Sequence, residues 1–211
     1  MAKMILIMLE GSVVSLEVFF LTLLFSIPLG LPIAAARMSR FKPLSALANV
    51  FMLIIRGTPL MLQLIFVYFA PYHLFKVSYD RFTAAIIALS VNYAAYFAEI
   101  YRGGIQSIPR GQYEAAKMLG YTRSQTFFRI VLPQVCKRII PATGNEVITL
   151  VKDTALVQVI GVTELLRVAQ TQSSRLFSTT PIFVAGIFYF VMNYLVAEAF
   201  RLIEKRLSYY R

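Results

Sequence analysis

The feature that most constrains this chain is a series of long apolar runs separated by short basic segments. The run from Val13 to Ala36 holds about 24 residues, and about 20 apolar residues are enough for a helix to cross the hydrocarbon core of a bilayer. Similar runs occupy residues 82–101 and 181–200. Because backbone polar groups inside a membrane must bond within the segment, these runs are expected to be helical. The sequence therefore predicts an all-α polytopic membrane protein.

Composition and charge agree with a membrane protein and argue against two other classes. Hydrophobic residues make up 58% of the 211 residues and charged residues 15%, whereas a soluble domain has roughly 25% charged residues. A net charge of +11 is compatible with nucleic-acid binding. However, the basic residues fall in short segments between apolar runs, and they form no basic helix face. Membrane insertion explains that distribution, so no nucleic-acid partner is predicted.

The apolar runs predict about five transmembrane helices within a single transmembrane domain, residues 1–211. The second is expected to be broken or re-entrant, because Arg56-Gly57-Thr58-Pro59 interrupts its apolar residues. The first could instead be a signal peptide cleaved near Ala34 to Ala36, but it is longer than a usual signal-peptide core, so an uncleaved helix is favoured. The expected spans are residues 13–36, 57–72, 82–101, 138–158 and 181–200, and a short external helix is expected at 163–172.

The distribution of Lys and Arg predicts the orientation. With the N-terminus outside and the C-terminus in the cytoplasm, 15 of the 21 Lys and Arg residues lie on the cytoplasmic side. Cytoplasmic segments are the ones enriched in Lys and Arg. Residues 102–137, a charged stretch between the third and fourth spans, then form a cytoplasmic loop. The six basic residues left outside this set are Lys3, Lys76, Arg81, Lys152, Arg167 and Arg175.

The cytoplasmic loop is predicted to fold as two short helices joined by a sharp turn. Gly120 stands where a left-handed residue would end the first helix, and glycine adopts that conformation without strain. Thr122 and Gln125 have the spacing of a capping box at the start of the second helix. Ala115 and Ala116 are expected to give the first helix a smooth face that a partner protein could approach. The apolar stripe expected on the second helix is Phe127, Phe128, Val131 and Leu132.

Polar side chains recur on one face of two predicted spans. In the third span they are Asn92, Tyr96 and Glu99, and in the fourth Thr143, Glu146, Thr149 and Asp153. Charged groups are costly in hydrocarbon, about 2.5 to 3.5 kcal/mol at a helix centre, so they face a protein interior or a water-filled cavity. These stripes are therefore expected to line a pathway or a contact with a second subunit.

Structural explanations of the same residues stay open. Glu99 lies near the end of its span and could pair with Arg102, and Asn92 could join helices by hydrogen bonding. Asp153 could pair with Lys152. The single histidine, His73, and the single cysteine, Cys136, predict neither a metal site nor an intrachain disulfide.

The cytoplasmic loop also carries a family resemblance. Glu114-Ala-Ala, Gly120, Ile130, Leu132 and Pro133 match in order the EAA motif of permease subunits of ATP-binding-cassette (ABC) importers. Residues 56–64 (RGTPLMLQL), 92–106 (NYAAYFAEIYRGGIQ) and 144–161 (GNEVITLVKDTALVQVIG) resemble permeases for polar amino acids, and the resemblance runs from about Leu16 to the tail.

The resemblance implies a bacterial inner-membrane importer in which the first helix of the loop, with Glu114, Ala115, Ala116 and Gly120, docks on a separate ATPase. The expected partners are two ATPase subunits, a second permease subunit (a copy or a paralogue) and an extracytoplasmic substrate-binding protein. No phosphate-binding GxxxxGK[ST] sequence occurs in the chain, so ATP is expected to bind the partner subunits and no cofactor is expected here. Neither a catalytic residue nor an enzymatic activity is predicted.

The acidic stripe suggests a substrate class. The expected substrate-binding residues are Asn92, Glu146, Thr149 and Asp153: the carboxylates could accept an ammonium group, and Asn92 and backbone N–H groups could donate to a carboxylate. Two carboxylates on one face suit a second positive charge, so arginine, lysine or histidine is the hypothesis, although the family also imports glutamine, glutamate and cystine. Two alternatives are an ATP-independent secondary transporter or channel subunit with acidic ion sites, and a structural membrane anchor.

Overall fold

The computed structural model describes residues 2–207 and is helical throughout its regular elements, which confirms the all-α prediction. Met1 and residues 208–211, the ends of the expected 1–211 unit, lie outside the described residues. The helices are α1 (Ala2–Arg37), α2 (Lys42–Gly57), α3 (Leu60–Phe75), α4 (Arg81–Gln106), α5 (Arg110–Met118), α6 (Arg123–Thr126), the π-helical turn η1 (Phe127–Val131), α7 (Leu132–Asp153), the 3₁₀ segment η2 (Thr154–Ile160), α8 (Leu165–Leu176) and α9 (Thr180–Leu207).

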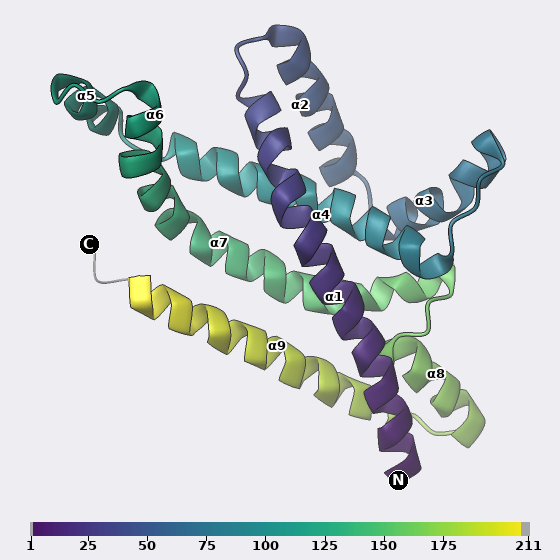
Figure 1. Ribbon diagram of the computed structural model, residues 1–211. Helices are drawn as coiled ribbons and strands as arrows, with labels where there is room; N and C mark the ends of the chain where they lie inside the picture. Colours follow the sequence, from purple (N-terminus) through teal and green to yellow (C-terminus); the bar gives the residue numbers. More distant parts are fainter. Residues whose placement is uncertain (1, 208–211) are drawn as a thin grey trace.

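Helix α4 is the centre of the structure, and α1 crosses it over a long contact (Figure 1). Small residues allow this close approach: α4 buries a series of alanines, and a Cβ placed on Gly30 of α1 would lie 3.0 Å from the Cβ of Phe97. Tyr93 and Phe97 of α4 are among the largest fully buried side chains, together with Leu64 of α3 and Leu150 of α7. The core is therefore formed around α4 by α1, α3 and α7.

The second apolar segment is broken, as predicted. Helices α2 and α3 meet at an angle of 109°. Pro59 has no N–H to donate and disfavours helical geometry at the residue before it, and Thr58 is extended with φ −118° and ψ 147°. The Thr58 hydroxyl donates to the carbonyl of Ile54 at 2.8 Å and so satisfies one carbonyl at the end of α2.

Within residues 2–207, three helices are long and apolar enough to cross a membrane, namely α1, α4 and α9, and the bent pair α2–α3 would be a fourth. Helix α7, the expected fourth span, has 22 residues but is not among them, because its polar stripe lowers its hydropathy. The count of five spans and the orientation stay predictions. In Figure 1, α5 and α6 stand at the opposite end of the molecule from α8 and the N-terminus.

The predicted short helix near 163–172 is present as α8, and a buried carboxylate anchors it. Glu164 is fully buried and accepts hydrogen bonds from the backbone N–H groups of Leu166 and Arg167, each at 2.7 Å. The hydroxyl of Tyr189 in α9 donates to the same carboxylate at 2.7 Å. Burial raises the pKa of Glu164, and these three hydrogen bonds oppose the rise. Glu164 thus caps α8 and joins it to α9.

The contact between α4 and α7 should tolerate no added methyl group at Gly104. A Cβ there would lie 2.3 Å from Cγ2 of Ile139, whereas one on the neighbouring Gly103 would meet nothing within 4 Å. We expect Gly104→Ala to lower the thermal unfolding midpoint in detergent, at an overpacking cost of about 1–3 kcal/mol. Gly103→Ala is the matched control and should leave the midpoint unchanged or raised. Equal midpoints for the two variants would contradict this packing.

Candidate substrate pathway and coupling turn

The turn between α5 and α6 has the geometry that the sequence predicts. Gly120 is left-handed, with φ +76°. The N–H of Tyr121 donates to the carbonyl of Ala116 at 3.0 Å, and the N–H of Gly120 donates to that of Lys117 at 3.0 Å. These two bonds make a Schellman cap, which satisfies the last carbonyls of α5 and turns the chain sharply.

The next helix begins at the predicted capping box. The N–H of Gln125 donates to the Thr122 hydroxyl at 3.3 Å, and the Gln125 side chain accepts from the N–H of Thr122 at 2.9 Å. The helix then passes through a π-helical turn before α7, and the N–H of Leu132 reaches the carbonyl of Phe127. Pro133 has no N–H, so the regular bonding pattern cannot run through this junction.

The outer surface of this turn differs in part from the expectation. Glu114 and Ala115 are exposed, but Ala116 is 1% exposed, because it packs inside the cap, so the expected alanine face consists of Ala115 alone. Sequence reasoning missed Met118 and Leu119, whose side chains are 87% and 75% exposed. Apolar side chains this exposed mark a surface that can bind another protein.

The expected apolar stripe after the turn is also only partly buried. Val131 is fully buried and Phe127 packs against the same small cluster, but Phe128 is 65% exposed. Phe128 therefore lies on the surface, apart from the buried part of the stripe. A π-helical turn accommodates an extra residue per turn, so the side-chain directions depart from the α-helical spacing on which the stripe was drawn.

The acidic stripe of α7 lies against α4. The hydroxyl of Tyr93 donates to Oδ2 of Asp153 at 2.7 Å. Glu146 is half-buried on the same helix, about two turns before Asp153. Thr149 lies between the two carboxylates, and its hydroxyl donates to the carbonyl of Asn145 at 2.9 Å.

No ion pair joins Lys152 to Asp153 in the described part of the chain; Lys152 is exposed, and Asp153 has Tyr93 as its partner. The sequence suggested Lys152 as the partner of Asp153 because the two residues are adjacent. It did not identify Tyr93 as the partner. Within the described residues, no three His, Cys, Asp or Glu side chains converge as metal ligands. The stripe therefore presents two carboxylates, and a buried tyrosine holds one of them, Asp153, in place.

Asn92 is buried and faces α3 rather than the acidic stripe. Its Nδ2 donates to Oε1 of Gln63 at 2.9 Å. Gln63 in turn donates from Nε2 to the carbonyl of Ile55 at 2.7 Å and to the hydroxyl of Thr58 at 2.8 Å. The Asn92–Gln63 pair thereby fixes the break between α2 and α3 against α4. This contact corresponds to the structural alternative, in which Asn92 joins helices by hydrogen bonding. The sequence pattern did not identify Gln63 as its partner.

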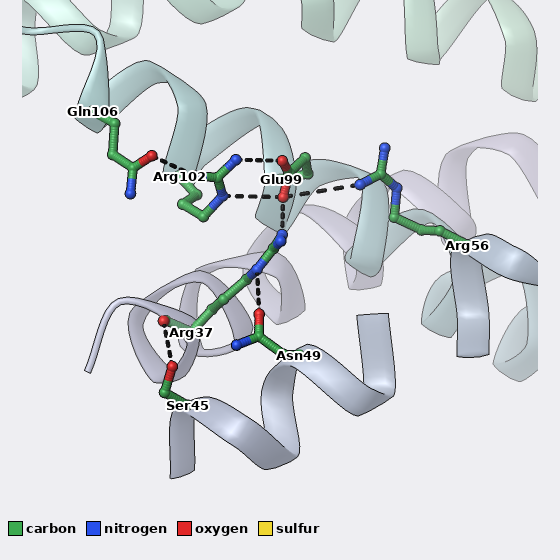
Figure 2. A network of polar contacts seen from close by, with 7 residues as sticks. All are labelled: Arg37, Ser45, Asn49, Arg56, Glu99, Arg102 and Gln106. Carbon is green, nitrogen blue, oxygen red and sulfur yellow. Dashed lines mark hydrogen bonds and ion pairs between the residues drawn. The ribbon is translucent and has the colours of Figure 1, made fainter. Parts of the chain in front are cut away.

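Glu99 is the centre of an arginine cluster at the same end of α4 as α5 (Figure 2). It forms ion pairs with Arg37 of α1 and Arg102 of α4, and Nη1 of Arg56 lies 3.9 Å from its Oε2. The expected Glu99–Arg102 pair is confirmed. Arg37 also donates from Nε to Oδ1 of Asn49 in α2 at 2.8 Å. One carboxylate thus connects the end of α1 and the end of α2 to α4.

Comparison with known proteins decides the family. The family model for the inner-membrane component of binding-protein-dependent transport systems matches residues 26–209. The chain belongs to this family. A permease of this family is a membrane subunit and not itself an enzyme, and the ATPase is a separate chain. The protein is an inner-membrane component of an ABC transporter, which sets aside the ATP-independent transporter and the structural anchor.

Several proteins with similar sequences are permease proteins of amino-acid transport systems. The chain is 36% identical to the arginine transport system permease protein of Bacillus subtilis, over 95% of this chain and 92% of that one. It is 39% identical to the L-cystine permease protein of the same organism, over 95% and 86%. It is 33% identical to a putative glutamine permease protein of Rickettsia felis, over 96% and 94%.

A solved structure agrees in fold. The crystal structure of an amino acid ABC transporter with histidines superposes with a TM-score of 0.91 at 37% identity, covering 98% of this chain and 96% of that one. The inward-facing methionine ABC transporter shares the fold with a TM-score of 0.78 at 20% identity, covering 98% and 99%.

The break between α2 and α3 should depend on Gln63. We expect Gln63→Leu to leave Asn92 and the carbonyl of Ile55 without partners, at about 1–3 kcal/mol for each buried group, and so to loosen the break. Hydrogen–deuterium exchange should then be faster in residues 54–63. Gln134→Leu is the control, because Gln134 bonds to the carbonyl of Ile130 and to Gln112, which both lie outside residues 54–63. Unchanged exchange in Gln63→Leu would show that the pair does not hold the break.

Proposed function

We propose that this permease imports basic amino acids such as arginine, lysine or histidine. The observation that carries the proposal is the pair of carboxylates, Glu146 and Asp153, on the face of α7 that packs against α4, where Tyr93 holds Asp153 in place. A cation is the ligand that compensates two carboxylates in apolar surroundings. The arginine permease of Bacillus subtilis and the solved transporter with histidines support the same substrate class.

The remaining groups of the amino acid also have partners in this proposal. Thr149 lies between the carboxylates and offers a hydroxyl. Helix α3 begins at Leu60, directly after the break, and the start of a helix presents free N–H groups and a positive dipole end to a carboxylate. Asn92 acts through Gln63, because this contact sets the position of the start of α3. The substrate carboxylate would bind at the break and its side-chain cation at the acidic stripe.

Energy would come from partner subunits. We infer two ATPase chains that bind ATP, a second permease subunit, and an extracytoplasmic protein that delivers the amino acid; this chain needs no cofactor of its own. The coupling surface would be Glu114 and Ala115, ordered by the Gly120 cap, with Met118 and Leu119 as apolar contacts; Ala116 is buried beneath this surface. Helix α7 follows the turn and ends at Asp153, so one continuous element joins the coupling turn to the acidic stripe.

Equilibrium binding of radiolabelled arginine to the purified transporter tests the substrate class. We expect Glu146→Gln and Asp153→Asn each to weaken arginine binding about ten-fold or more, since a lost charged hydrogen bond costs roughly 1.5–3 kcal/mol. Glu17→Gln is the matched control, because Glu17 is an exposed carboxylate of α1 away from the stripe. Arginine binding that is unchanged in both stripe variants, or uptake of glutamine in place of arginine, would refute the basic substrate.

The proposed coupling role of the turn between α5 and α6 predicts a defect in ATPase binding or in coupling, rather than in substrate binding. Gly120→Val places a β-branched residue at φ +76°, which strains the cap, and we expect less ATPase to co-purify or ATP hydrolysis to continue without uptake. The control is Gly111→Val, at the start of α5, where a Cβ meets nothing within 4 Å. This variant should retain both ATPase binding and coupled uptake. Normal coupling in Gly120→Val would remove the turn from the mechanism.

A further inference from the structure

A groove beside the arginine cluster combines a cationic wall with an apolar one. It is a wide-open depression of about 540 Å³ between the end of α1 and one face of α2. Asn49, Leu53 and Arg56 follow each other along that face at spacings of four and three residues. Its open end is at Gly57, where nothing lies within 4 Å of a Cβ position. The other lining residues are Arg37, Val50 and Met52.

The cationic wall carries more positive than negative charge. Three arginines surround one carboxylate, Glu99 (Figure 2). Arg56 has the weakest pairing with Glu99: its ion pair spans 3.9 Å, its side chain is 39% exposed, and within the described residues its other charge contact is with the ring of Tyr96, whose centre lies 5.2 Å from the guanidinium carbon. The Asn49 oxygen accepts from Arg37, while its amide nitrogen points away and remains available to donate (Figure 2). These groups suit an anion with several acceptor oxygens.

The apolar wall indicates that the anion carries a hydrocarbon tail. Leu53 is 75% exposed and Val50 is 52% exposed on the groove, and Leu47 and Ile54 extend this apolar surface along α2 with exposures of 68% and 54%. The groove begins where the apolar part of α1 ends at Arg37, so the predicted orientation places it at the level of the cytoplasmic lipid headgroups. Basic pockets at this depth are typical sites for anionic lipids. A free phosphate would use only the cationic wall.

We propose that this groove binds one anionic phospholipid, with the phosphate among Arg37, Asn49 and Arg56 and an acyl chain along Val50 and Leu53. The lipid phosphate supplies negative charge in addition to that of Glu99, and so balances more of the charge of the three arginines. Since Arg37 lies on α1, Arg56 at the break after α2, and both face Glu99 on α4, the bound lipid would hold three helix ends together.

Native mass spectrometry of the transporter, purified with its ATPase and titrated with phosphatidylglycerol or phosphatidylcholine, tests the proposal. We expect preferential retention of phosphatidylglycerol and about five-fold weaker binding in Arg56→Gln, since one basic residue contributes roughly 1 kcal/mol to anionic lipid binding. Asn49→Asp should weaken it similarly, although it keeps the acceptor for Arg37. Arg40→Gln is the matched control, because Arg40 is an exposed arginine between α1 and α2 that does not line the groove.

Three results would overturn the proposal. Asn49→Asp with unchanged phosphatidylglycerol binding would give the cluster a purely structural role. Inorganic phosphate that displaces the lipid at equal concentration would make the groove a free-anion site, since the acyl chain would then add nothing. Disulfide cross-linking between two permease copies through Leu53→Cys, in a Cys136→Ser background, would show that a second copy covers this face.

Discussion

The structure depends on a few polar side chains of the central helix α4 that bond to other helices. Hydrocarbon offers no hydrogen bonds, so a polar side chain there is stable only against protein or enclosed water. Three side chains of α4 have such partners: Asn92 bonds to α3, Tyr93 to α7, and Glu99 to α1 and to the end of α2. The polar residues of one helix thereby specify the positions of four others.

These contacts connect the two proposed functional regions, the coupling turn and the acidic stripe, through packed helices. Helix α7 carries the acidic stripe and follows the coupling turn, with the π-helical segment and Pro133 at the junction. Helix α4 holds the other end of α7 through Tyr93 and Asp153. A displacement of the coupling turn would therefore act on the carboxylates through a continuous helix, and the α2–α3 break is tied to the same α4 surface.

Much of the local structure could be predicted because it depends on residues within a few positions of each other. The Gly120 cap, the Thr122–Gln125 capping box and the break at Pro59 each follow from backbone stereochemistry, and all three are present. Side-chain exposure was less predictable. Ala116 is buried by its own cap and Phe128 is exposed by the π-helical turn, and neither outcome follows from helical spacing alone.

The sequence by itself determined the helical class, the membrane setting, the position of the turn and the face of α7 that carries Glu146 and Asp153. Only the tertiary structure decided the partners: Tyr93 for Asp153, 60 residues away, Arg37 for Glu99, 62 residues away, and Gln63 for Asn92, 29 residues away. Periodicity shows which residues share one face of a helix, because that geometry is local. It does not show which other helix packs against that face, since that depends on how the whole set of helices buries its surfaces together.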